Sequence, residues 1–177
     1  MSKIATNAIY IALTSRNPTK EDPEEYHWML WLVDKDISNG MCVHATNPSK
    51  SSSIPKLIGF NVLVAGAFEF QTKPWKAAAS MNLIALLQIG QLGSHPIEQL
   101  IKELSEVPLH NTKVDMGFFN CRVWLGQALA DFAKHGVIHC DNIPTLEEEA
   151  IDEADKVREA VEQGSSKAVV NISKLSK

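Results

Sequence analysis

The sequence predicts an α+β fold, in which a mostly antiparallel sheet packs against helices. Apolar segments typical of strands dominate the first half of the chain, and segments with helical periodicity follow them. The dipeptide Asn39-Gly40 separates two of the apolar segments, which is a strong signal for a β-hairpin. Strands that come first and helices that come later are typical of α+β proteins.

Five segments are expected to form strands. They lie at Ile4–Leu13, His27–Val33, Met41–Thr46, Phe60–Phe70 and Ser80–Ile89, and the last two are expected to pair in the same sheet. The segment Ser80–Ile89 is ambiguous, because Met81, Ile84 and Leu87 would also suit one face of a helix.

Three helices are expected in the second half of the chain. The first begins at Pro96, since proline suits the first helical position. The second covers Cys121–Lys134, where apolar residues recur at helical spacing. The third begins with a capping box formed by Thr145 and Glu148 and stops at Gly164. We therefore expect a catalytic-type α+β domain over residues 1–140 and a C-terminal helical extension over residues 141–177.

Composition excludes several classes of protein. The net charge of -4 argues against a nucleic-acid partner, which normally requires a basic face. No apolar run is long enough for a transmembrane segment. The three cysteines lack the spacing of a disulfide framework, so free thiols and a cytoplasmic location are expected.

The third helix carries an apolar stripe that must be buried. Its members are Leu146, Ala150, Ile151, Ala154, Val157 and Val161. An isolated amphipathic helix of this length is marginal in water. The stripe is expected to dock on the body of the protein or on a neighbouring subunit, which makes a homo-oligomer through the C-terminal helix possible.

The residues of greatest chemical interest are one cysteine and two histidines. Cys121 lies in the first turn of a predicted helix, where the helix dipole favours the thiolate and the unpaired amides can bind an oxyanion. His27 begins one predicted strand and His44 lies near the end of the next. These are the parts of a site for nucleophilic catalysis by cysteine. Asn120 and Arg122, which flank the cysteine, are candidates for stabilising the oxyanion or positioning the substrate.

Each residue also has a structural interpretation. Free cysteine is among the most buried residue types, and His27 could bond to backbone at a strand end. A zinc site of Cys42, His44, His139 and Cys140 can also be drawn. Adjacent His and Cys ligands are awkward, however, and no CxxC motif is present. We therefore expect no metal and no cofactor.

These motifs resemble those of the lecithin retinol acyltransferase-like (LRAT-like) proteins. His27-Trp28 before an apolar strand, Val43-His44-Ala45 before Pro48, and Asn120-Cys121 before a helix are similar to that family's His-Trp-Ala, Val-Ile-His-Leu and Asn-Cys-Glu-His-Phe segments. The family belongs to the NlpC-type papain-like group in circularly permuted form, and PPPDE peptidases share its histidine-then-cysteine order. Arg122 and Val123 depart from the family pattern after the cysteine. The His-Trp and Cys-Arg-x-Trp pattern is also similar to a group of uncharacterised fungal proteins.

The resemblance implies a permuted papain-like (NlpC/LRAT-like) fold, in which the sheet packs on the cysteine-bearing helix. It implies that Cys121 is the nucleophile, His27 the base and His44 the third member. The expected function is thiol-dependent acyl transfer or hydrolysis of a small-molecule or acyl substrate through an acyl-cysteine. The alternatives are a non-catalytic binding or assembly protein that keeps the fold, and an isopeptidase-like enzyme.

Overall fold

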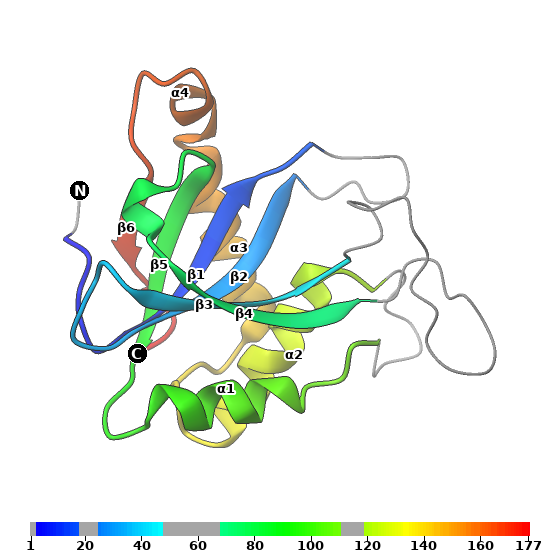
Figure 1. Ribbon diagram of the computed structural model, residues 1–177. Coiled ribbons are helices and arrows are strands. Elements are labelled where there is room, and N and C mark those ends of the chain that lie inside the picture. Colours follow the sequence, from blue (N-terminus) through cyan, green and yellow to red (C-terminus); the bar gives the residue numbers. More distant parts are fainter. Residues whose placement is uncertain (1–2, 18–24, 48–67, 111–118) are drawn as a thin grey trace.

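The computed structural model describes residues 3–17, 25–47, 68–110 and 119–177. Strands precede helices along the chain as the sequence predicts, apart from the short helix η2 and a last strand near the C-terminus (Figure 1). The strands are β1 Ala8–Ser15, β2 Tyr26–Val33, β3 Gly40–Thr46, β4 Glu69–Trp75, β5 Leu83–Gln91 and β6 Val169–Ile172. The helices are η2 Ala77–Ala79, α1 Ile97–Ser105, α2 Cys121–Lys134, α3 Ile143–Asp155 and α4 Arg158–Glu162.

The six strands form one sheet in the order β4-β3-β2-β1-β5-β6. Every neighbouring pair is antiparallel except β5 and β6, which run parallel. The predicted α+β class and the mostly antiparallel sheet are therefore confirmed. The ambiguous segment Ser80–Ile89 contains a strand, β5. The predicted strand Phe60–Phe70 falls mostly outside the described residues, but its end overlaps β4. Strands β4 and β5 share the sheet without pairing with each other.

The turn between β2 and β3 follows the predicted Asn-Gly hairpin. The carboxylate of Asp36 accepts a hydrogen bond from the backbone N–H of Ser38 at 2.8 Å, which is typical of an Asx turn. A Cβ on Gly40 would lie 2.2 Å from Nε1 of Trp31, so the glycine is required for the close approach of the returning strand.

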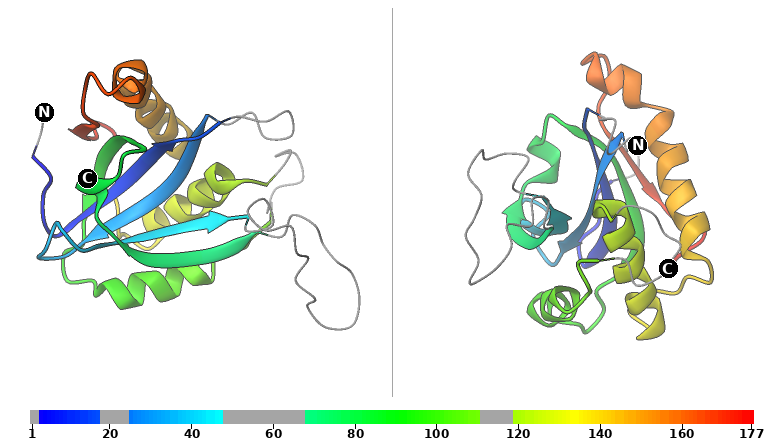
Figure 2. Two further views of the ribbon diagram at one scale, coloured as in Figure 1. Left: turned by 45° about the horizontal axis from the view of Figure 1, so that its top comes forward. Right: turned by 90° about the vertical axis from the view of Figure 1, so that its right-hand side faces the viewer.

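The two faces of the sheet bury different sets of residues. Alternate residues such as Ile11, Trp28 and Val43 join the main core, together with buried side chains of α1, α2 and α3. The intervening residues, such as Tyr10 and Trp31, form a second core with Ala77 of η2. Figure 2 shows the long helices gathered on one side of the sheet and η2 on the other. Helix α2 packs against β2 and β3, so one face of the sheet positions the cysteine-bearing helix.

Helix α3 differs from the prediction at both ends. The side chain of Asn142 caps it by accepting from the backbone N–H of Thr145 at 3.1 Å, so the predicted capping box of Thr145 and Glu148 is wrong. The cap lies three residues before the predicted cap at Thr145, because Pro144, which follows the Asn142 cap, fits the first helical turn. The helix also stops at Asp155, and a separate short helix, α4, follows.

The C-terminal residues complete the body of the protein. Leu146, Ala150 and Ala154 of α3 are each at most 1% exposed in the main core. The other members of the predicted stripe, Ile151, Val157 and Val161, are partly buried and pack against this core, so the stripe docks on the body of its own chain; the homo-oligomer stays a prediction. Strand β6, which the sequence analysis did not predict, then extends the sheet beside β5.

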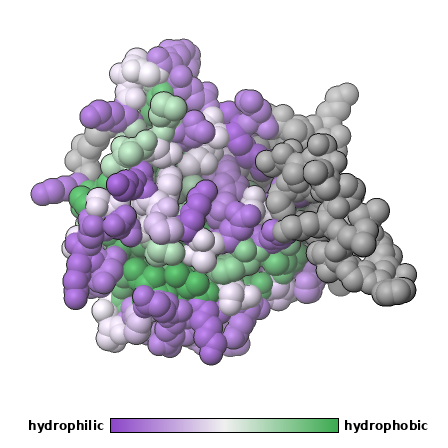
Figure 3. Space-filling view, viewed as in Figure 1, coloured by the Kyte–Doolittle hydropathy of each residue, from purple (hydrophilic) through white to green (hydrophobic). Residues whose placement is uncertain are grey.

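The remaining surface is mainly polar on the face shown in Figure 3, with a band of hydrophobic residues between β4 and α1. Within the described residues, no helix has both the length and the apolar character needed to cross a membrane.

Candidate active site

Helix α2 places Cys121 at its first position, as the sequence predicts. The side chain of Asn120 is the N-cap and accepts a hydrogen bond from the backbone N–H of Val123 at 3.0 Å. The helix ends before Gly136, which adopts a φ of 73° that favours glycine. Cys121 itself is only 2% exposed and belongs to the main core. The thiol therefore lies where the positive end of a capped helix meets the sheet.

The structure brings the two predicted histidines together. Nε2 of His27 on β2 lies 2.6 Å from Nδ1 of His44 on β3, and the rings meet edge to face. The ladder between these strands covers only Leu30–Leu32 and Met41–Val43. Both histidines therefore lie beyond the end of this ladder. Their hydrogen bond joins β2 and β3 where backbone pairing between these two strands has stopped. Contact between the imidazoles is what the predicted roles of base and third member require, while these catalytic roles stay predictions.

The environment of His44 keeps its imidazole neutral. Burial, together with the smaller effect of the positive charge on Lys73, lowers the pKa of His44 to about 4. At neutral pH its Nδ1 can therefore accept a hydrogen bond from the Nε2–H of His27. The Nε2 atom of His44 is buried and has no hydrogen-bond partner among the described residues. With its Nε2 engaged by His44, His27 has Nδ1 as the nitrogen through which it would act on a thiol.

Arg122 joins three elements around the start of α2. Its Nε donates to the Glu147 carboxylate of α3 at 2.9 Å, and its guanidinium lies 5.3 Å from the ring centre of Trp28 on β2. Gly126 leaves room for the Glu147 carboxylate, because a Cβ there would lie 2.6 Å from one of its oxygens. The guanidinium thus binds α2 to its neighbours. The predicted roles of Asn120 and Arg122 toward an oxyanion or substrate stay predictions.

The sequence analysis did not identify Arg16 as a site residue. Its Nη1 atom lies 4.0 Å from Sγ of Cys121, the limit for a hydrogen bond to sulfur. The backbone N–H of Arg16 donates to the carbonyl of Glu25 at 3.1 Å, which extends the β1–β2 hairpin by one residue pair. The residues from Ser15 to Glu25 are mostly polar and include two prolines, a composition typical of a loop, so the sequence contains no signal for the backbone pairing of Arg16.

Strand alternation separates the thiol from the imidazoles. Trp28, which faces α2, shares the main core with Cys121, whereas Met29 and Cys42 belong to the second core. His27 and His44 alternate with main-core residues, so on regular strands they face away from α2. An approach of His27 to the thiol therefore depends on the region beyond the β2–β3 ladder, where these two strands no longer pair with each other. If the three residues form a catalytic site, we expect Sγ of Cys121 and a ring nitrogen of His27 to lie within about 4 Å of each other.

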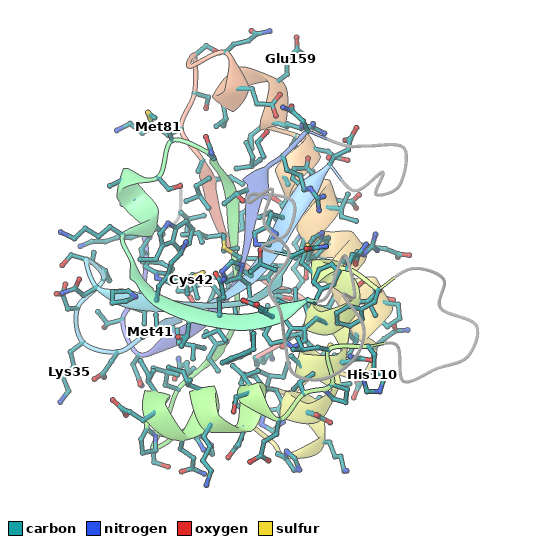
Figure 4. All side chains as sticks on the ribbon, turned by 45° about the vertical axis from the view of Figure 1, so that its right-hand side comes forward. Lys35, Met41, Cys42, Met81, His110 and Glu159 are labelled. Carbon is teal, nitrogen blue, oxygen red and sulfur yellow. The ribbon has the colours of Figure 1, made fainter. Side chains whose placement is uncertain are left out.

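The other cysteines have different surroundings. Cys42 is fully buried, its sulfur lies 3.3 Å from that of Met29, and burial raises the pKa of its thiol to about 12. Figure 4 shows Cys42 inside the body of the protein. Cys140 is half-buried. Across the described parts of the chain, no three His, Cys, Asp or Glu residues are grouped in a way that could hold a metal ion.

These features define an α+β protein with a cysteine at the start of a core helix and a pair of hydrogen-bonded histidines on adjacent strands. Residues 7–163 match the model of a family of unknown function, DUF6914, and the chain belongs to that family. Comparison with curated proteins and with solved structures found no significant match.

Proposed function

We propose that this protein is a cysteine-dependent hydrolase or acyltransferase with a permuted papain-like fold. The observation that carries the proposal is the hydrogen bond of 2.6 Å between His27 and His44, whose strands both pack against the helix that begins at Cys121. A nucleophile, a base and a group that orients the base are the requirements of this chemistry. The order of histidine, histidine and cysteine along the chain agrees with the resemblance to LRAT-like proteins.

The neutral state of His44 supports its role as the orienting group. When His27 takes the proton of Cys121, it becomes an imidazolium with an N–H on each nitrogen. A neutral His44 accepts the hydrogen bond from Nε2 of this imidazolium, whereas a protonated His44 would repel it. The pKa of about 4 therefore suits His44 to the stabilisation of a thiolate–imidazolium pair.

The reaction would proceed in two steps. The Cys121 thiolate attacks the carbonyl carbon of an ester, thioester or amide, and the amides of the first turn of α2 stabilise the oxyanion. His27 then gives its proton to the leaving group, and the acyl-cysteine forms. In the second step His27 removes a proton from water or an acceptor, which attacks the thioester and releases Cys121.

The second candidate is a non-catalytic binding or assembly protein that keeps this fold. The 2% exposure of Cys121 favours it, as does the alternation of His27 and His44 with residues of the main core, the core to which Cys121 belongs. On that view, Cys121 fills a core position and the histidine pair fastens two strands to each other.

Alkylation of Cys121 separates the two candidates. The protein is treated with iodoacetamide from pH 5 to pH 9, and modification of each cysteine is followed by peptide mass spectrometry. An enzyme should show modification of Cys121 well below pH 8 and faster than modification of Cys140, the half-buried internal reference. His27→Ala should slow this reaction. A Cys121 that reacts only at alkaline pH, at the same rate with and without His27, would contradict the enzymatic proposal.

Turnover is then tested with p-nitrophenyl esters of short and long acyl chains. Cys121→Ser should abolish the acyl-enzyme that electrospray mass spectrometry detects, and the near-isosteric change should leave the melting temperature close to that of the parent. His27→Ala should reduce the rate more than His44→Ala, because His44 acts through His27. Equal rates for the parent and Cys121→Ser would refute the mechanism.

A cytoplasmic location stays a prediction. Among the described residues all three cysteines are free thiols, as expected for a reducing compartment.

A further inference from the structure

We propose that Arg16 is a positioning residue that stabilises the thiolate of Cys121. The inference rests on the proposed function, because a thiolate matters only if Cys121 is a nucleophile. The carrying observation is the distance of 4.0 Å between Nη1 of Arg16 and Sγ of Cys121. A guanidinium stays protonated throughout the physiological pH range, so its positive charge is permanent there. An opposite charge at this distance favours the ionised form of its neighbour.

The fold holds Arg16 in place from both sides. The backbone N–H of Arg16 donates to Glu25 on the β2 side at 3.1 Å, and that of Ser15 donates to Asn82 on the β5 side at 2.8 Å. The hydroxyl of Ser15 also donates to Glu162 of α4 at 2.5 Å. The end of β1 is therefore anchored to three neighbouring elements. The Arg16 side chain starts from a fixed point next to the first turn of α2.

Among the residues that the structure describes, the other charged groups around α2 do not provide this charge. Arg122, which follows the cysteine, is neutralised by Glu147 at 2.9 Å. His44 on β3 is neutral because burial, together with Lys73, lowers its pKa to about 4. His27 on β2, a further titratable group among the described residues of the site, becomes positive only when it takes a proton.

In the described part of the chain, two carboxylates near the end of β1 form ion pairs with another arginine. Glu25 and Glu162 both form ion pairs with Arg158 at the beginning of α4, and Tyr26 lies beneath the same guanidinium. Arg158 thus offsets the negative charge at the ends of β1 and β2. In this arrangement Arg16 and His27 act on Cys121 from neighbouring strands, one as a permanent charge and the other as a proton carrier.

The test measures the ionisation of Cys121 directly. Protein labelled with ¹³C at the cysteine β-carbon is titrated from pH 4 to pH 10 by NMR, and Cys→Ser variants assign the resonances. This measurement requires no reagent to reach the buried thiol. Arg16→Gln should raise the pH midpoint of Cys121 by about one to two units. Arg16→Lys, which keeps the charge, should restore most of the shift, and the Cys140 resonance should titrate identically in all proteins.

The outcomes distinguish this inference from the proposed function. An unchanged midpoint in Arg16→Gln, with a raised midpoint in His27→Ala, would overturn the role of Arg16 and leave the cysteine–histidine site intact. If Arg16→Gln raises the Cys121 midpoint and His27→Ala leaves it unchanged, the result would support the role of Arg16 and refute His27 as the base. Equal midpoints in Arg16→Gln and Arg16→Lys, both shifted from the parent, would show that Arg16 acts through packing and not through charge, and would also overturn the inference.

Discussion

Removing the imidazole of His44 should change how the stability of the protein depends on pH. In the folded protein, burial lowers the pKa of His44 from its ordinary value of 6.5 to about 4. Between these two values the unfolded chain binds a proton that the folded protein does not. The free energy of unfolding therefore rises with pH across this interval. The part of it that depends on a neutral His44 is fully present only above about pH 6.5.

The size of the effect follows from the two pKa values. The difference between 6.5 and about 4 corresponds to about 3 kcal/mol of folding free energy, lost progressively as the pH falls from neutral to about 4. His44→Gln cannot take up this proton. From pH 7 to pH 4, the free energy of unfolding of the parent should therefore fall by about 3 kcal/mol more than that of His44→Gln. This difference does not depend on how far the substitution itself destabilises the protein at neutral pH.

The assay is urea denaturation of parent and variant at half-unit steps of pH, followed by tryptophan fluorescence. Effects of titrating groups that are distant from His44 cancel in the difference between the two proteins. His110→Gln is the matched control, because it removes a histidine from an exposed position, labelled in Figure 4. A difference between the parent and His44→Gln that stays constant from pH 7 to pH 4 would refute the claim that His44 is held neutral by burial.

Two substitutions test the elements that position the site. Asn120→Ala removes the side-chain cap of α2 and should lower the free energy of unfolding by about 1 kcal/mol in urea denaturation; an effect near zero would show that the cap at 3.0 Å contributes nothing. Leu146→Ala empties a core position that is 0% exposed and should cost about 2–5 kcal/mol in the same assay. Glu148→Ala, at an exposed position of the same helix, serves as its control. An equal loss of unfolding free energy in the two variants would mean that Leu146 of α3 does not stabilise the main core.

The contrast between α2 and the C-terminal part shows which signals in a sequence are local. Helix α2 begins at Cys121 and ends at Lys134 as predicted, because the cap, the apolar spacing and the closing glycine all lie within the helix and its borders. The hairpin at Gly40 was predictable for the same reason. Strand β6 was not, because a strand of four residues has little periodicity of its own and is defined by pairing with β5, far away in the sequence.

The candidate site likewise has some features that the local sequence predicts and others that depend on tertiary structure. The sequence by itself determined that Cys121 opens a helix and that His27 and His44 lie on adjacent strands of a hairpin. Tertiary structure alone decided that the β2–β3 ladder stops short of the histidines, that their rings meet at 2.6 Å, and that Arg16 reaches Cys121. It also decided that Cys121 of α2 packs in the main core, with strand residues that alternate with His27 and His44. Local sequence fixes the residue that starts a helix, whereas the distance between side chains of different elements depends on sheet twist, strand register and the packing of the helix above them.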